Sequence, residues 1–375
     1  MANADLLAWL RLTLTPGVGP VTARRLLATF GLPAEIWSQS EAALAQVVGH
    51  KLAQALLAEP ADLQAQYRLT CEWLDPPNAT AHRGCLTLAD PEYPQGLLET
   101  ADPPLLLYLQ GDLASLHSPR ALGVVGSRNP TPQGLANARA FGLALSDAGV
   151  CVVSGLALGV DGAAHTGALE GSGPTLAVVG TGLDRVYPKQ HLELAHRIAA
   201  RGALVSELPI GTPPVSSNFP KRNRLIAGLS RGTLVVEAAL QSGSLITARL
   251  ASEMGREVFA IPGSIHSPQS RGCHALIKQG AKLVESAQDI LEELGWDAPH
   301  SSDGPSALGH AAAPGDSGLE PALLVAMGHD PVSFDALQAR CGLGTAQLQA
   351  QLLELELDGT VARLPGGLFQ RLGRG

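Results

Sequence analysis

The sequence predicts an α/β protein with a Rossmann-like, doubly wound sheet at its centre. From residue 121 onward, short apolar runs alternate with helical stretches, which is the pattern of parallel strands covered by helices on both faces. The first 75 residues instead show apolar positions at helical spacing, and residues 319–375 show three helical stretches and a short hairpin. At 375 residues the chain exceeds the usual size of one domain, so we expect several units.

We divide the chain into four segments. These are an N-terminal all-α domain over 1–75, a Rossmann-like domain over 86–295, a flexible linker over 296–318 and a winged-helix domain over 319–375. The linker is rich in Ala, Gly, Pro, Ser and His and has no hydrophobic period. Residues 86–118 are rich in proline, and we expect them to form an extended connector along the domain surface.

Seven apolar runs in the central part are the candidate strands. They cover residues 122–125, 151–153, 175–179, 203–205, 233–236, 258–261 and 282–284. Helical stretches fill the gaps, for example residues 134–147 and 192–200. A parallel sheet with helices on both faces follows from this alternation.

Composition and charge narrow the classes of function. Hydrophobic residues make up 45% and charged residues 16%, which excludes a disordered, highly charged chain. The formal net charge of −8 argues against a globally basic nucleic-acid coat. Residues 121–235, however, hold 10 Lys and Arg against 6 Asp and Glu, between two acidic flanks. Such a basic island suits a phosphate-binding cleft, although solvated surface charge would also explain it.

Five scattered cysteines without a CxxC pair indicate a reduced compartment and no zinc site. The histidines His191 and His196 lack the HExxH spacing, and we expect neither a metal nor a cofactor. The N-terminus shows no secretory signal, and no segment is long and uncharged enough to span a bilayer. We therefore expect a cytoplasmic protein without membrane contact.

The N-terminal helices enclose a glycine-containing turn. Gly17 and Gly19 flank one apolar residue, and an amphipathic helix follows. The motif resembles a helix-hairpin-helix module, in which glycines let backbone N–H groups at a helix start approach a DNA phosphate. A plain packing joint between two helices fits the motif equally well, and acidic neighbours oppose strong DNA binding.

The C-terminal unit predicts a winged helix with an unusual charge. Its third helical stretch, residues 345–358, carries Glu354, Glu356 and Asp358 but neither Lys nor Arg. Because many winged helices bind DNA through this helix, phosphates would be repelled here. A protein-contact or regulatory role is the better interpretation.

Ligands of doubly wound sheets bind at the carboxyl ends of the strands, so the loops there hold the candidate site. After the first central strand come Gly126, Ser127 and Arg128, which offer close backbone approach, a hydrogen-bond donor and a fixed positive fork. After the third strand, a short GxG loop leads to Tyr187 and Lys189, and Lys189 suits a phosphate contact. The chain contains neither a full GxGxxG nor a GxxxxGK[ST] motif, so it shows no nucleotide-binding signature.

Residues 218–230 form the richest segment. Lys221, Arg222 and Arg224 open an apolar helix, where cations oppose the helix macrodipole, so binding of an anion explains them better than helix stability does. Phe219 suits stacking on a base, although a buried hinge aromatic is as common.

Two further strand-end segments are less specific. Ser154, Asp161 and His165 suggest a catalytic set, but the chain has no GxSxG elbow and Asp161 suits a helix cap, so we favour a structural role. Residues 235–248 again join a strand end, a small-residue loop and a helix whose first N–H groups suit an anion.

Taken together, these motifs closely resemble the DNA-processing protein DprA (Smf) family. They run in family order over more than half of the chain: VVGSR, SGLALGVDGAAH, GTGLDRVYPK, NFPKRNRLIAGLS, VVEAALQSGSLITA and FAIPGSI. Members of the family often carry an N-terminal helix-hairpin-helix or SAM-like region, and some carry a C-terminal winged helix. One departure is the turn that ends in Gln190 and His191, where many relatives have an asparagine.

The resemblance implies a non-enzymatic protein that binds single-stranded DNA during natural transformation, or competence, and homologous recombination. Such proteins shield incoming DNA, load the RecA recombinase on it and act as homodimers through the Rossmann domain. The family's DNA contacts fall on Arg128, Lys189 and Lys221. We add Gly126, Ser127 and Phe219, and also Arg222 and Arg224, one of which could instead pair with Glu237 or Asp184.

Two other hypotheses remain. The first is a nucleotide phosphoribohydrolase-like enzyme of the lysine-decarboxylase-like group, whose members carry a PGGxGT loop near the fifth strand and a catalytic Glu. The corresponding residues 237–247 hold Ser242, Gly243 and Ser244 in place of that loop, which weakens this reading. The second is a scaffold for RecA-like partners in which the DNA cleft is secondary.

Overall fold

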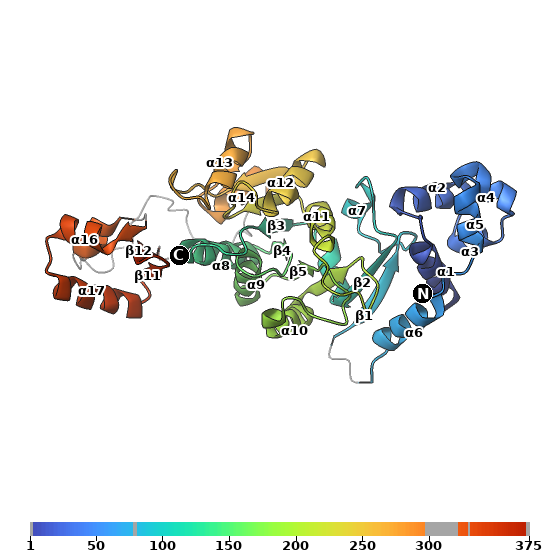
Figure 1. Cartoon of the computed structure of the whole chain (residues 1–375), viewed down its shortest axis with the longest axis horizontal. Coiled ribbons are helices and arrows are strands. Elements are labelled where there is room, and N and C mark those ends of the chain that lie inside the picture. The colour runs from blue at the N-terminus through green and yellow to red at the C-terminus, as the bar shows by residue number, and fades with distance from the viewer. Residues whose placement is uncertain (1–2, 78–80, 297–321, 329–330, 373–375) are drawn as a thin grey trace, which may run out of the picture.

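The structure is a computed structural model that describes residues 3–77, 81–296, 322–328 and 331–372. Figure 1 shows three parts in a row, which are the N-terminal helices, the sheet with its covering helices and the C-terminal unit. The expected linker, residues 296–318, lies outside the described residues apart from Trp296.

Among the described residues of the central part, nine strands form one sheet in the order β1-β2-β6-β5-β4-β3-β7-β8-β9. The strands are β1 (Arg83–Thr87), β2 (Leu106–Gly111), β3 (Ala121–Val125), β4 (Cys151–Ser154), β5 (Thr175–Val178), β6 (Ala203–Ser206), β7 (Gly232–Val235), β8 (Glu257–Ala260) and β9 (Lys282–Leu283). In this order, all the strands from β6 through β5, β4, β3, β7 and β8 to β9 are parallel to their neighbours. Strand β2 is antiparallel to both of its neighbours, β1 and β6. The chain runs from β3 outward to β6 on one side and then from β7 to β9 on the other, which confirms the doubly wound prediction.

The proline-rich segment departs from the prediction. Residues 106–111 are not a surface connector but the largely buried strand β2, in which Tyr108 pairs with Ser206 of β6. The reason is that Pro103 and Pro104 precede the strand, so they remove no hydrogen bond from its ladder.

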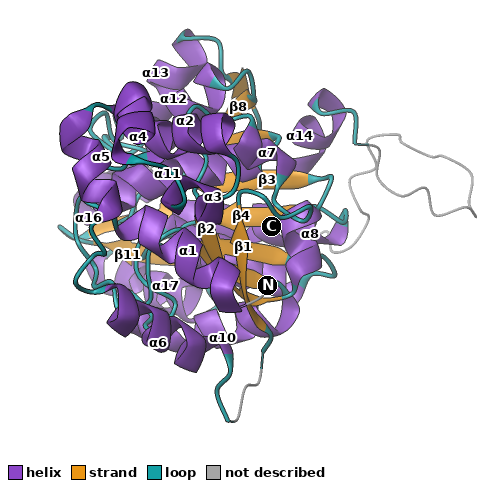
Figure 2. Ribbon diagram, turned by 90° about the vertical axis from the view of Figure 1, so that its right-hand side faces the viewer, coloured by secondary structure: helices purple, strands orange, loops and turns teal. Residues whose placement is uncertain are grey.

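Helices cover both faces of the sheet (Figure 2). One face carries α7 (Gln95–Leu98), α11 (Asn218–Leu229), α12 (Ser244–Glu253) and α13 (Arg271–Lys278). The other carries α8 (Pro132–Asp147), α9 (Val160–Glu170), α10 (Leu192–Arg201) and α14 (Ala287–Glu293). Neighbouring strand residues therefore enter different cores: Val125 packs toward α11 and Val124 toward α8. The 3₁₀ turns are η1 (Leu113–His117) and η2 (Lys189–His191).

The N-terminal helices share a core with the end of the sheet. They are α1 (Asn3–Leu14), α2 (Pro20–Phe30), α3 (Pro33–Trp37), α4 (Glu41–Val48), α5 (His50–Leu57) and α6 (Leu63–Leu74). Trp73 of α6 packs edge-on against Tyr108 of β2, with ring centroids 5.9 Å apart. Arg24 of α2 donates a hydrogen bond to the Ala101 carbonyl at 2.8 Å, which joins the N-terminal helices to the central part.

The C-terminal unit has its own core and the predicted winged-helix layout. It comprises α15 (Ala322–Met327), β10 (Val332–Ser333), α16 (Phe334–Cys341), α17 (Thr345–Leu357), β11 (Val361–Leu364) and β12 (Leu368–Arg371), with β12 between β10 and β11. Leu337, Leu348 and Phe369 are among the buried residues that hold it together.

Helices α8 and α9 approach closely at two glycines. A Cβ on Gly167 would lie 2.0 Å from the Arg139 carbonyl oxygen, and one on Gly142 would lie 2.3 Å from that of Ala164. These contacts fix α9, whose first residues border the strand ends that hold the candidate site.

We expect Gly167→Ala to lower the free energy of unfolding by about 1–3 kcal/mol, because the added methyl meets backbone that must shift. Urea unfolding followed by circular dichroism measures this change. Gly84→Ala is the matched control, since its Cβ would lie at an ordinary 3.4 Å from the His82 side chain. Equal effects of the two substitutions would contradict the role of the glycine contact.

Candidate functional site

A hollow of about 700 Å³ lies beside the neighbouring strands β3 and β7. At this point the order in which strands are added to the sheet changes direction. The loops after these two neighbouring strands line the hollow together with the start of α11. Five of the residues predicted from the sequence line it: Gly126, Ser127, Arg128, Phe219 and Arg222.

The loop after β3 is held in a fixed turn. The Ser127 N–H donates to the Glu237 carbonyl at 2.7 Å, and the Ser127 Oγ accepts the Asn129 N–H at 3.1 Å. At Gly126 a Cβ would lie 2.7 Å from Val160, so only glycine lets the loop pack on the start of α9. This turn leaves the Arg128 guanidinium exposed at the rim of the hollow.

Two aromatic rings and a cation stand together at that rim. The rings of Tyr187 and Phe219 lie 5.5 Å apart and tilted by 36°, and the Arg128 guanidinium lies 5.4 Å from the Phe219 ring. Tyr187 is 46% exposed and lines the hollow. The sequence reasoning missed Tyr187 as a site residue; its signal is an aromatic residue in a strand-end loop.

Arg222 is the nearly buried member of this lining and forms part of the floor of the hollow. Its side chain is 4% exposed, and its Nη1 donates to the Val178 carbonyl at 2.7 Å. It faces Asp161, whose carboxylate accepts the N–H groups of Gly155 at 3.1 Å and Ala157 at 3.3 Å. Burial lowers the pKa of Arg222 to about 10, while the Asp161 charge opposes that shift.

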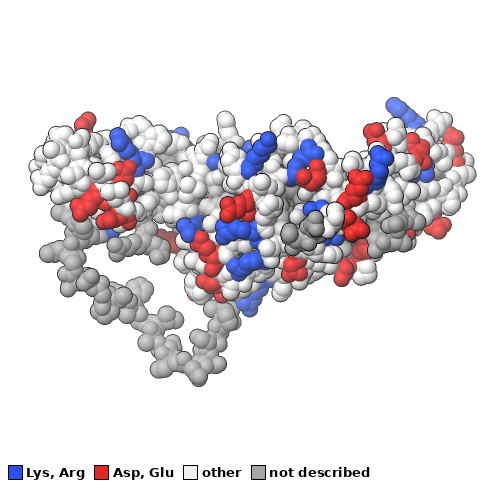
Figure 3. Space-filling model, turned by 90° about the horizontal axis from the view of Figure 1, so that it is seen from below, with Lys and Arg blue, Asp and Glu red and all other residues white. Residues whose placement is uncertain are grey.

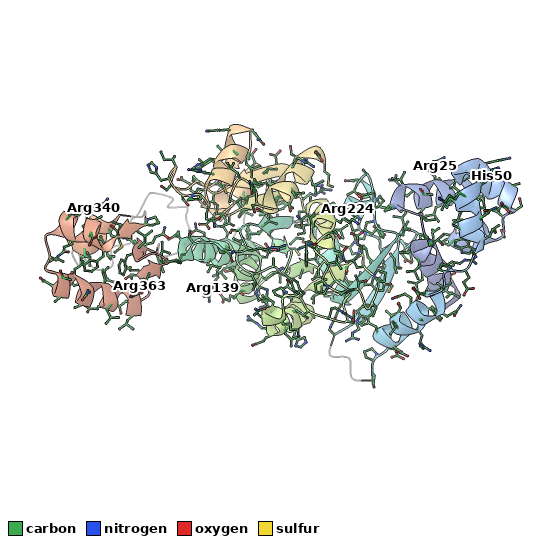
Figure 4. All side chains as sticks on the ribbon, viewed as in Figure 1. Arg25, His50, Arg139, Arg224, Arg340 and Arg363 are labelled. Carbon is green, nitrogen blue, oxygen red and sulfur yellow. The ribbon has the colours of Figure 1, made fainter. Side chains whose placement is uncertain are left out.

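Of the other predicted cations, Lys221 is exposed and lines a neighbouring groove of about 1020 Å³ between α11, α12 and the N-terminal hairpin. Lys189 is exposed on the turn η2. Arg224 lies on the sheet side that faces the N-terminal helices (Figure 4). It pairs with Asp102 at 3.0 Å and with Glu207.

The expected alternative pairing was therefore wrong in its partners. Glu237 pairs with neither Arg222 nor Arg224. Its carboxylate instead accepts hydrogen bonds from the backbone N–H of Thr131 at 2.9 Å and from the Thr131 hydroxyl at 2.6 Å. Asp184 pairs with the neighbouring Arg185. Burial raises the pKa of Glu207, and the Arg224 charge opposes that rise.

The suggested catalytic set is not assembled. The Ser154 hydroxyl donates to the Val124 carbonyl at 2.6 Å, and the His165 Nδ1 pairs with the Thr175 hydroxyl at 2.7 Å. Burial lowers the pKa of His165 to about 3, so this imidazole stays neutral. The structural interpretation of these residues is the one that the contacts support.

The start of α12 also lines the hollow. Ser242, Gly243, Ser244 and Thr247 line the hollow there, as expected for a helix start that faces an anion. The Asn223 amide donates to the Gly243 carbonyl at 3.3 Å and so joins α11 to the start of α12.

Charge on the surface is mixed rather than uniformly basic. Figure 3 shows Lys and Arg interspersed with Asp and Glu over the underside of the central part. Within the described residues, no group of three or more His, Cys, Asp or Glu side chains could hold a metal ion. No helix of the described part is long and apolar enough to cross a membrane.

Comparison with known proteins adds to this geometry. Family models match three segments: "DNA recombination-mediator protein A" residues 84–295, "DprA winged helix domain" residues 308–367 and "SAM-like Helix-hairpin-helix tandem" residues 10–62. The chain is 47% identical over 305 residues to Protein Smf of Escherichia coli (strain K12), covering 80% of each chain.

Among the solved structures that are similar to this one are two of DNA processing protein A. The X-ray structure of DNA processing protein A from Streptococcus pneumoniae has a TM-score of 0.66 at 36% identity, covering 78% of this chain and 98% of that one. The structure of DNA processing protein A from Helicobacter pylori, a protein with a unique single-stranded DNA binding mode, has a TM-score of 0.52 at 30% identity. It covers 58% of this chain and 97% of that one.

We expect Arg222→Leu to lower the free energy of unfolding by about 3–5 kcal/mol at pH 7.5, because Asp161 is left buried without its counter-charge. Burial already raises the pKa of Asp161 above its ordinary value, and Arg222 opposes that rise. Without Arg222 the pKa rises further, so stability returns as pH falls through it and the carboxyl takes up a proton.

Urea unfolding at pH 5 and pH 7.5 tests this expectation. The loss is expected to be smaller at pH 5, and adding Asp161→Asn to Arg222→Leu should recover part of it at pH 7.5. A loss that is equal at both pH values would show that the two charges are not coupled.

Proposed function

Because the chain belongs to the DNA recombination-mediator protein A family, we propose that it binds single-stranded DNA across the hollow at the switch point of its sheet. The family is one of DNA-processing, recombination-mediator proteins and not of enzymes. The observation that carries the proposal is the meeting of the exposed Arg128 with the exposed ring of Tyr187 and the half-buried ring of Phe219 at one end of the sheet. Backbone phosphates and unstacked bases need these two kinds of group.

In this proposal Arg128, Lys189 and Lys221 contact phosphates, because all three are exposed cations: Arg128 in the loop after β3, Lys189 on η2 and Lys221 in the first turn of α11. Gly126 and Ser127 hold the turn that presents Arg128, and Phe219 stacks on a base together with Tyr187. Arg222 and Arg224 act from below the surface, because both are committed to buried or half-buried carboxylates.

We assign the wider role to the whole chain. It protects incoming single strands in natural transformation, loads the RecA recombinase on them and works in the cytoplasm as a homodimer through its Rossmann domain. In this proposal segments 1–75, 86–295 and 319–375 are the domains, with DNA binding in the central one and the first packed on it through a shared core. The acidic α17 supports a protein-contact role for the C-terminal domain, since phosphates would repel its carboxylates.

The enzyme alternative lacks its catalytic group. A phosphoribohydrolase of this fold would need a free carboxylate near the fifth strand. Glu237, which follows β7, instead has both carboxylate oxygens bonded to Thr131 at the start of α8. A carboxylate in that position stabilises the helix start.

Three phosphate contacts predict a slope of about −2 for log affinity against log salt concentration on single strands. Arg128→Ala, Lys189→Ala and Lys221→Ala should each weaken binding to all sequences alike and reduce the slope by about 0.7. Fluorescence anisotropy of a labelled oligothymidine, with duplex DNA as competitor, measures both. Arg139→Ala is the control, since this exposed arginine pairs with Glu170 on α9, outside the hollow. Strong sequence preference, or unchanged binding in all three variants, would refute the proposal.

Tyr187→Ala tests the stacking contact separately from charge. We expect a loss of about 1–3 kcal/mol in binding with an unchanged salt slope, because no phosphate contact is removed. Tyr187→Phe should bind as the wild type does. A changed slope in Tyr187→Ala would place the ring beside the backbone rather than the bases.

A further inference from the structure

The turn that follows β4 is held in an unfavourable backbone conformation. Leu156 has φ of 57°, and it is the only non-glycine residue with a positive φ in the part of the chain that the structure describes. Its side chain is fully buried, so packing holds the residue in place. Left-handed backbone at a side-chain-bearing residue persists only where its surroundings impose it.

Hydrogen bonds hold this turn on both sides. The Asp161 carboxylate accepts the N–H groups of Gly155 and Ala157, which flank Leu156. The Leu156 carbonyl in turn lies 3.0 Å from the Nδ1 of His191. Since a carbonyl only accepts, the His191 Nδ1 carries the proton and donates it.

His191 belongs to a different loop, and that loop carries a proposed DNA contact. His191 ends the turn η2, which begins at Lys189, and its N–H donates to the Pro188 carbonyl at 3.0 Å. Its ring also fills the space over Gly162, where a Cβ would lie 2.6 Å from the His191 Cε1. The imidazole therefore joins the exposed turn of Lys189 to the fixed turn of Leu156.

A second connection completes the arrangement. Arg222 faces Asp161 on one side and donates to the carbonyl of Val178 on the other, at the end of the strand that leads to the Lys189 loop. The loops after β4 and β5 are thus linked twice, once deep in the protein through Arg222 and once near the surface through His191.

We propose that His191 is a positioning residue for single-stranded DNA binding, which fixes the Lys189 turn by donating a hydrogen bond to the Leu156 carbonyl. The inference rests on the proposed function of the hollow and adds to it a residue that does not itself touch DNA. The group that His191 contributes is its Nδ1–H donor, which is three bonds from Cα. Asparagine offers its Nδ2 at the same number of bonds, whereas leucine fills similar space without a donor.

The experiment therefore compares His191→Asn and His191→Leu in the full chain. Anisotropy with the labelled oligothymidine should show about three- to tenfold weaker binding for His191→Leu, the range of one net hydrogen bond. His191→Asn should stay within about twofold of the wild type if it restores that bond. On a Lys189→Ala background, His191→Leu should weaken binding no further, because the tether acts through Lys189.

Hydrogen–deuterium exchange supplies a readout that does not depend on DNA. The peptide that spans residues 155–161 should exchange faster in His191→Leu than in the wild type and His191→Asn. If His191→Leu fails to fold, as judged by circular dichroism, His191→Ala takes its place.

Several results would overturn the proposal. His191→Leu could bind as the wild type does while Lys189→Ala binds weakly, or the two losses could add in the double variant. Equal weakening in His191→Asn and His191→Leu would assign the effect to ring volume instead of the donor. If the wild type does not bind single strands, the proposed function fails, and unchanged exchange of residues 155–161 would separately exclude the tether.

Discussion

The candidate site depends on one buried pair of charges, Arg222 and Asp161. Burying a guanidinium and a carboxylate removes both from water, and the cost is offset only when further hydrogen bonds satisfy them. Here Val178 accepts from the arginine, and two loop amides donate to the aspartate. Gly155 makes the approach possible, since a Cβ there would lie 1.8 Å from the Arg222 Nη1. The pair thereby joins α11 to the ends of β4 and β5.

This fixed floor explains how the exposed groups above it work as one surface. A mobile Lys or Arg loses side-chain entropy whenever it orders on a ligand, so presenting it from a rigid turn reduces the cost of binding. Arg128 and Tyr187 each contact the ring of Phe219. The hollow combines a rigid base with charged and aromatic groups at its rim, which suits a polymer that is recognised by its backbone and base faces.

Much of this was predictable from the sequence, for physical reasons. Short apolar runs such as residues 151–153 that alternate with helices are typical of buried parallel strands. The doubly wound topology then brings the loops after β3 and β7 together. The roles of individual cations were not predictable. Arg222 and Arg224 lie two residues apart in one motif, yet one enters the floor and the other pairs with Asp102 and Glu207. Which carboxylate meets which arginine depends on three-dimensional packing, and neither Asp102 nor Asp161 is near them in sequence. Strand β2 was missed because proline density concealed its apolar run.

The distribution of charge also determines the kind of phosphate ligand that fits. In doubly wound folds a nucleotide commonly places its phosphates at the helix start after the first strand. Here that position is the start of α8, where the Glu237 carboxylate already accepts both hydrogen bonds from Thr131. The carboxylate also lies close to Gly134, since a Cβ there would be 2.4 Å from the Glu237 carboxyl carbon. A phosphate would have to displace a carboxylate. The exposed cations lie farther out, because Arg128 is at the rim, Lys221 lines the neighbouring groove and Lys189 stands on its own turn. A mononucleotide within a hollow of about 700 Å³ would leave Lys221 and Lys189 without a phosphate, whereas the proposed ligand, a strand of several nucleotides, is long enough to extend beyond the hollow toward both.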